Sequence, residues 1–153
     1  MLLIRPDSWN LPLILHVGGA MLLVGSLALA TLLFIQSWRE REPETSSSLF
    51  RFGALTMFFA VLPAYILMRI GAQWVLSREH LENSNATWIG IGFGASDFGA
   101  LLLIISLILC GIAVRRVNRG GAAGKLAKAG GGIALLLIAL YVIAIWAMTT
   151  KPS

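Results

Sequence analysis

Four long apolar runs dominate this chain, and each is long enough to cross a lipid bilayer. A helix needs about 20 apolar residues to span the hydrocarbon core. The runs cover Leu11–Gln36, Phe50–Leu76, Trp88–Val114 and Leu126–Thr149. Of the 153 residues, 58% are hydrophobic and 12% charged, whereas soluble domains average about 45–50% apolar and about 25% charged residues. Because open-ended segments satisfy their backbone in lipid only as helices, we predict an all-α integral membrane protein, a four-transmembrane-helix bundle in one domain (1–153).

The connections between the runs are short, so neighbouring helices should be antiparallel. We expect polar loops over Ser37–Leu49, Ser77–Thr87 and Arg115–Lys125. Most basic residues lie in or beside the first and third connections: Arg39, Arg41, Arg51, Arg115, Arg116, Arg119, Lys125 and Lys128. Since basic residues are enriched on the cytoplasmic side, both termini are predicted to be non-cytoplasmic. Tryptophans mark the predicted boundaries as an aromatic belt, with Trp9, Trp74, Trp88 and Trp146 outside and Trp38 inside.

The charge balance and the cysteine usage exclude several other classes of protein. A pI near 10.2 would indicate nucleic-acid binding in a soluble protein. Here the basic residues lie between apolar runs, so we expect the lipid bilayer as partner and no nucleic acid. The single cysteine, Cys110, excludes an internal disulfide and a multi-cysteine metal site. The glycine-rich segment 120–125 resembles a phosphate loop, but it is one residue short and Leu126 stands where Ser or Thr would hold magnesium.

The apolar run after residue 10 is too long for the core of a signal peptide, and we expect a retained helix.

Two backbone irregularities are also expected. Pro63 leaves the carbonyl of Phe59 without its usual donor, which permits a kink in the second helix. The third helix begins with Gly90, Gly92 and Gly94, where the backbone is free to be irregular and where Gly90 and Gly94 form a small-residue pair suited to close helix packing.

The outer halves of the predicted spans contain one histidine and two charged residues: His16, Arg69 and Asp97. Each is about one to two helical turns from the same outer surface. A charge in hydrocarbon is costly and needs a partner, so we predict that Arg69 and Asp97 pair across consecutive helices. Tyr65 and Gln73 lie one turn either side of Arg69. The candidate polar cluster is therefore His16, Tyr65, Arg69, Gln73 and Asp97, with Ser96 and Tyr141 as secondary members. The pair either only fixes helix register or lies at the floor of a cavity that opens outward.

His16 has two interpretations. A single membrane histidine is most simply a hydrogen-bonded packing residue, and His16 begins a stripe of small or polar positions at helical spacing: Gly19, Leu23, Ser26 and Ala30. Alternatively, His16 is an axial ligand of haem or a ligand of copper. The second ligand would then come from another copy of the chain, from Met68 or from Met148, because the other histidine, His80, lies in a predicted loop.

Several short segments resemble an uncharacterised bacterial family of predicted four-helix integral membrane proteins. These segments are 16–25 (HVGGAMLLVG), 63–69 (PAYILMR) with Gln73-Trp74, 88–92 (WIGIG) and Asp97-Phe98-Gly99. That family is loosely similar to the copper-resistance D-like membrane proteins, whose first helix also opens with a histidine before small residues. The resemblance implies a bacterial inner-membrane location. It would imply copper handling through His16 alone.

Three functions remain open from the sequence. The first is a non-catalytic subunit or scaffold of a membrane complex, with a helix–helix partner or a homo-oligomer, because almost the whole chain is predicted bundle. The second is a small transporter or solute-binding protein, whose outward cavity at Arg69 and Asp97 would suit an anion. The third is a haem- or copper-binding redox protein that uses His16. An enzyme is least expected, since no nucleophile–base pairing or metal-ligand spacing is visible.

Overall fold

The computed structural model describes residues 10–78, 87–121 and 124–150, and the regular elements in this part of the chain are helices. Helix α1 spans Leu11–Arg39. Helix α2 (Pro43–Thr56), the π-helical turn η1 (Met57–Val61) and α3 (Leu62–Arg78) follow one another as a continuous rod. Helix α4 spans Thr87–Asn118 and α5 spans Gly124–Thr150. These four rods are long and apolar enough to cross a membrane, so the predicted all-α four-helix membrane bundle is confirmed.

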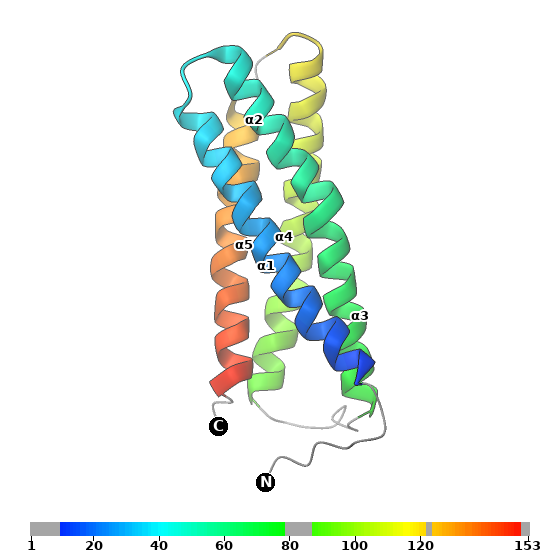
Figure 1. The fold of residues 1–153 in the computed structure, drawn as a ribbon. Coiled ribbons are helices and arrows are strands. Elements are labelled where there is room, and N and C mark those ends of the chain that lie inside the picture. Colours follow the sequence, from blue (N-terminus) through cyan, green and yellow to red (C-terminus); the bar gives the residue numbers. More distant parts are fainter. Residues whose placement is uncertain (1–9, 79–86, 122–123, 151–153) are drawn as a thin grey trace.

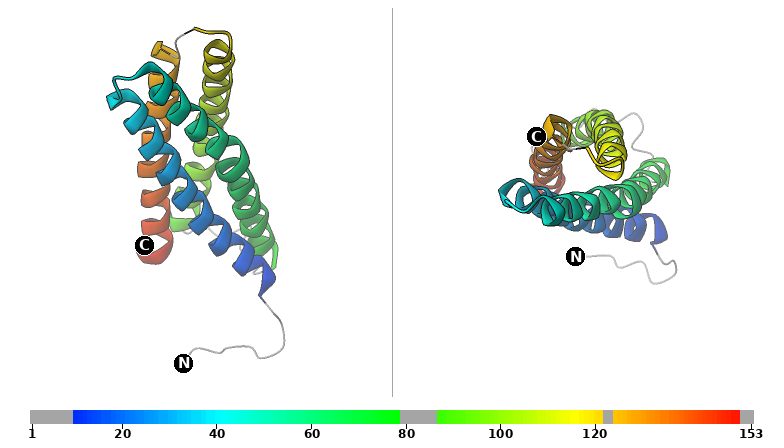
Figure 2. Two further views of the ribbon diagram at one scale, coloured as in Figure 1. Left: turned by 45° about the horizontal axis from the view of Figure 1, so that its top comes forward. Right: turned by 90° about the horizontal axis from the view of Figure 1, so that it is seen from above.

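The bundle consists of two layers. α1 packs along α3 and α4 packs along α5, while α3 and α4 barely approach each other. Viewed along its length, the molecule has α1 and the α2–α3 rod on one side and α4 and α5 on the other (Figure 2). The fully buried core draws on both layers, with Leu23, Leu27, Phe34, Phe50, Met57, Leu103 and Leu137 as its largest aliphatic and aromatic members.

The turn between α1 and α2 lies at the same end of the bundle as the turn between α4 and α5 (Figure 1, top). We call this the basic end, because it carries Arg39, Arg41, Arg51, Arg115, Arg116, Arg119, Lys125 and Lys128. Phe34 and Phe50 pack here with ring centroids 5.5 Å apart. The opposite end, where α1 and α4 begin and α3 and α5 end, is the outer end in the predicted topology.

The first connection is much shorter than expected. A polar loop over Ser37–Leu49 was the expectation, and it is wrong, because only residues 40–42 lie outside helices. Pro43 starts α2 in its first turn, a position where the missing N–H of proline costs nothing. The carboxylate of Glu40 accepts the backbone N–H groups of Arg41 (2.8 Å) and Glu42 (3.1 Å). The polar residues after Pro43 therefore form the first turns of α2.

The glycine-rich segment after α4 forms a helix stop. Gly120 has a φ of +79°, which costs a glycine little and other residues much. Its N–H donates to the carbonyl of Val117 at 3.0 Å, and the N–H of Gly121 donates to Arg116 at 2.9 Å. These two bonds form a Schellman motif. The glycines that make this segment resemble a phosphate loop therefore serve to end α4.

The two expected backbone irregularities have different outcomes. The turn η1 lies directly before Pro63, and the N–H of Leu62 donates to Met57, five residues back. Pro63 has no N–H to donate, and the widened turn lies where the regular hydrogen-bond pattern of the helix is interrupted. The glycine-rich start of the third helix, by contrast, is regular α-helix within α4.

In the aromatic belt, Trp74 and Trp146 are exposed near the outer end, whereas Trp9 and the side chain of Trp88 lie outside the described part.

Candidate functional site

Two glycines bring α1 and α3 into direct backbone contact, and this contact positions His16. A Cβ atom at Gly19 would lie 2.5 Å from the backbone nitrogen of Met68, and one at Gly71 would lie within 3 Å of the His16 backbone. At this crossing, His16 Nδ1 is 3.2 Å from the carbonyl oxygen of Met68. Because a carbonyl oxygen only accepts hydrogen bonds, Nδ1 carries the proton and Nε2 is left facing other groups.

The predicted pairing of Arg69 and Asp97 is present. One guanidinium nitrogen of Arg69 is 2.6 Å from Asp97 Oδ1, and another donates to Ser96 Oγ at 3.2 Å. The guanidinium carbon lies 5.1 Å from the centre of the Phe93 ring, a cation–π distance. The side chains of Arg69 and Asp97 are 32% and 64% exposed, so the pair lies at the edge of the gap between α3 and α4.

Tyr65 adds a second link across the same gap. Its hydroxyl donates to the backbone carbonyl of Ser96 at 3.3 Å. Tyr65 and Arg69 lie four residues apart on α3, and therefore on one face of the helix. The α3 and α4 backbones barely approach each other. In the described part of the chain, the polar contacts between these two helices are made by the side chains of Tyr65 and Arg69. We call Tyr65, Arg69, Ser96 and Asp97 the outer bridge.

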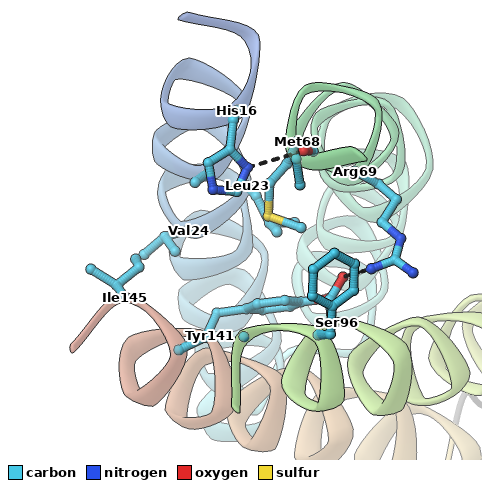
Figure 3. Close-up of a pocket in the computed structure, with 13 residues that line it drawn as sticks. His16, Leu23, Val24, Met68, Arg69, Ser96, Tyr141 and Ile145 are labelled. Atoms are coloured by element: carbon cyan, nitrogen blue, oxygen red, sulfur yellow. Dashed lines mark hydrogen bonds between the residues drawn. The ribbon is translucent and has the colours of Figure 1, made fainter. Parts of the chain in front are cut away.

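A cavity of about 60 Å³ lies beside the outer bridge, between the two layers (Figure 3). All four membrane rods contribute to its wall. The residues that line it are His16, Ala20, Leu23, Val24, Met68, Arg69, Ala72, Gly92, Phe93, Ser96, Tyr141, Ala144 and Ile145. Most of these side chains are aliphatic or aromatic, so the wall is largely apolar and has a few polar groups on one side.

Tyr141 provides the most unusual polar group in this wall. Its ring extends from α5 below Met68 toward Ser96 (Figure 3), and the residue is only 3% exposed. The hydroxyl is buried and has no hydrogen-bond partner among the described residues. Gly99 makes room for it, because a Cβ atom there would lie 2.5 Å from the hydroxyl oxygen. A buried hydroxyl without a partner costs about 1–3 kcal/mol, and a small movement of the ring that brought the hydroxyl to a hydrogen-bonding molecule in the cavity would recover that cost.

The structure brings together most, but not all, of the predicted cluster. His16 and Arg69 line the cavity, and Tyr65, Arg69 and Asp97 belong to the outer bridge. Gln73 does not join them: it is exposed on α3, and no hydrogen bond links it to the cluster. Of the secondary members, both Ser96 and Tyr141 line the cavity.

The space and the donor atoms around His16 decide whether haem or copper fits at this site. A cavity of about 60 Å³ is smaller than the space of about 150 Å³ that holds a single benzene ring, so haem does not fit here. Met68 lines the same cavity as His16, which leaves a histidine and a thioether for a soft metal such as copper(I). The described residues contain no group of three His, Cys, Asp or Glu side chains placed to hold a metal. His80 and the side chain of Met148 lie outside the described part.

Several residues of the site are absent from the sequence-based cluster. Phe93 lies one turn before Asp97 on the same face of α4, and that spacing could have indicated its contact with Arg69. Met68 takes part through its backbone carbonyl, which no side-chain pattern reveals. Ala72, Ala144 and Gly92 leave the void simply by being small, and small residues also occur throughout the helix contacts.

The fold and the site define a class: a four-helix integral membrane protein with two helical layers and a small, mainly apolar cavity between them. Comparison with known proteins takes the identification no further. No protein-family model, no curated protein and no solved structure matches the chain.

Proposed function

We propose that this chain is a small solute-binding or transport protein of the bacterial inner membrane. Its binding site is the cavity beside the outer bridge, and its ligand is a small, mainly apolar molecule with one hydrogen-bonding group. The observation that carries the proposal is a largely apolar cavity to which all four rods contribute, with the His16 imidazole and the unpartnered Tyr141 among its few polar residues.

The depth of the site supports access from the outer surface. About 20 helical residues cross the hydrocarbon core. Counted from the basic end, with Gln36 and Arg51 taken as the inner boundary, the outer boundary falls close to His16 on α1 and Gly71 on α3. The outer bridge therefore lies near the outer edge of the hydrocarbon, where a partly exposed ion pair is tolerated. The orientation, with both termini non-cytoplasmic, follows from the basic residues.

The charges around the cavity revise the expected ligand. An anion was the expectation from Arg69, but Asp97 balances that charge at 2.6 Å and Ser96 takes a further guanidinium hydrogen. A second anion would compete with an existing partner. The groups left to engage a ligand are the Tyr141 hydroxyl and the free nitrogen of His16. A hydroxyl, carbonyl or amine on an apolar molecule smaller than benzene matches this combination, because the cavity of about 60 Å³ is below the space of about 150 Å³ that holds a benzene ring.

Native mass spectrometry of protein extracted gently from its own membrane tests the proposal. We expect an adduct of low mass on the wild-type chain. Ala144 is buried in the cavity wall, so Ala144→Leu should fill the void and remove at least about 90% of the adduct, in line with an overpacked site. Ala139→Leu, on the exposed side of the same helix, is the matched control and should retain it. Equal adduct on both variants, or none on wild type, would refute the proposal.

A second candidate function is a non-catalytic subunit or scaffold of a membrane complex. It is favoured by Gly90 and Gly94, because Cβ atoms at both positions would meet nothing within 4 Å. This small-residue face of α4 is left open by the chain itself and suits close packing against another membrane helix. In the same mass measurement, a multiple of the 16.5 kDa chain or an added protein mass would favour this candidate. The copper-binding reading of His16 predicts a metal adduct instead.

A further inference from the structure

A second and larger cavity lies at the basic end, far from the outer bridge. It has a volume of about 950 Å³, within the range of about 300–1,000 Å³ that is usual for small-ligand pockets. Its wall combines the end of α1, the first turns of α2, the Schellman turn after α4 and the start of α5, including Trp38, Arg41, Ser47, Arg51 and Gly121. Both layers of the bundle contribute, so the cavity exists only in the folded chain.

The basic side chains in this wall form no ion pair with the carboxylates near them. The guanidinium groups of Arg41 and Arg51 make no hydrogen bond or ion pair with any described residue, and the single salt bridge among those residues is the one at Arg69. Of the nearby carboxylates, Glu40 already accepts two backbone N–H groups and Glu42 accepts the hydroxyl of Thr45. Glu44 remains as the one acidic wall residue without such a contact.

Neutral hydrogen-bond donors surround the same space. Trp38 belongs to the wall, and its indole Nε1 is buried behind the wall surface without a partner among the described residues. The hydroxyls of Ser47 and Ser48 line the wall and are not engaged by described side chains, whereas Ser46 is bound to Ser37. The first backbone N–H groups of α2 point toward this end as well, and a helix N-terminus favours an anion.

We propose that the cavity at the basic end binds a phosphate group, supplied either by an anionic lipid headgroup at the membrane edge or by free phosphate. Unpaired arginines recognise phosphate through paired N–H donors, and basic pockets between membrane helices on the cytoplasmic side bind anionic lipid headgroups. The site depends neither on the outer cavity nor on the solute-binding role proposed above.

Two variants of equal charge test this assignment. Arg41→Gln/Arg51→Gln removes the cavity arginines, and Arg39→Gln/Arg115→Gln removes two exposed arginines at the same end that do not line the cavity. All four side chains are exposed, so we expect both variants to fold, with unchanged helical circular dichroism. Each purified protein is titrated with phosphatidylglycerol or phosphatidylcholine in detergent and observed by native mass spectrometry. A parallel titration uses inorganic phosphate and calorimetry.

We expect wild type and the control variant to retain one phosphatidylglycerol, and the cavity variant to bind it at least about 30-fold more weakly, because its phosphate loses the charge-assisted hydrogen bonds of two arginines. Phosphatidylcholine should bind weakly to all three. Saturable binding of inorganic phosphate that the cavity variant alone loses would also support the site and would identify free phosphate as its source. Equal losses in both variants would reduce the effect to surface charge and overturn the proposal, as would the absence of saturable binding in both titrations.

Discussion

Single glycines decide how closely the first and third helices approach. Gly19 and Gly71 face each other's helices so closely that any side chain would overlap backbone atoms. Backbone atoms cannot move aside as a flexible side chain can, so these two positions admit only glycine. The same contact places the Met68 carbonyl within reach of His16. Residue identity at this crossing therefore controls both stability and the geometry of the cavity wall.

The neighbouring glycine provides a matched control for this conclusion. Gly19→Ala should lower the free energy of unfolding by about 2–3 kcal/mol, as expected for overpacking against backbone. Gly18→Ala should not lower it and should raise it by up to about 1 kcal/mol, because a Cβ atom there meets nothing within 4 Å and alanine has the higher helix propensity. Reversible unfolding of each variant in mixed micelles, followed by circular dichroism, measures both values. Similar losses in the two variants would contradict the close crossing.

At the scale of elements, the bundle is two tight pairs joined loosely at the outer end. α1–α3 and α4–α5 pack along much of their length, whereas α3 and α4 meet mainly through the outer bridge. Toward the basic end the two layers contact each other directly, α1 against α5 and α2 against α4, with Gly131 of α5 lying against Phe34 and Trp38 of α1. The outer bridge is thus the polar contact that sets the width of the gap beside the cavity.

Loss of the ion pair should open this gap. Arg69→Gln removes a charged bond worth about 1 kcal/mol in a partly exposed setting, and we expect longer distances between spin labels at the exposed positions Ile70 on α3 and Phe98 on α4. Labels at Phe52 on α2 and Ile112 on α4, nearer the basic end, should keep their separation. Pulsed electron paramagnetic resonance measures both pairs. An unchanged outer distance would show that packing, and not the bridge, determines the gap.

At the scale of the whole molecule, the two ends differ in charge and in openness. The basic end holds the larger, polar cavity, and the outer end holds the smaller, apolar one. Since basic residues are retained on the cytoplasmic side, the two cavities are predicted to be reached from opposite faces of the membrane.

Reporter fusions in a bacterial host test this orientation. Alkaline phosphatase, which is active only outside the cytoplasm, should be active when fused after Thr150 and inactive when fused after Arg119 within the turn at the basic end. The expected difference is at least about tenfold, because the bias of lysine and arginine between the two ends is strong. The reverse pattern would invert the topology and place the phosphate cavity on the outer face.

The sequence by itself determined the four membrane helices and their antiparallel order, because apolar length and short connections depend only on local composition. It also predicted the Arg69–Asp97 pair, since helix depth can be counted and a charge in lipid needs a partner. It missed the helical start of α2, because Pro43 reads equally as a loop residue or as the first residue of a helix. Only the tertiary structure decided that Gln73 lies outside the cluster, that Asp97 neutralises Arg69 beside an apolar cavity, and that Tyr141 is buried without a partner. Those outcomes depend on how the two layers pack against each other, and that packing arises from contacts between distant residues that local patterns do not encode.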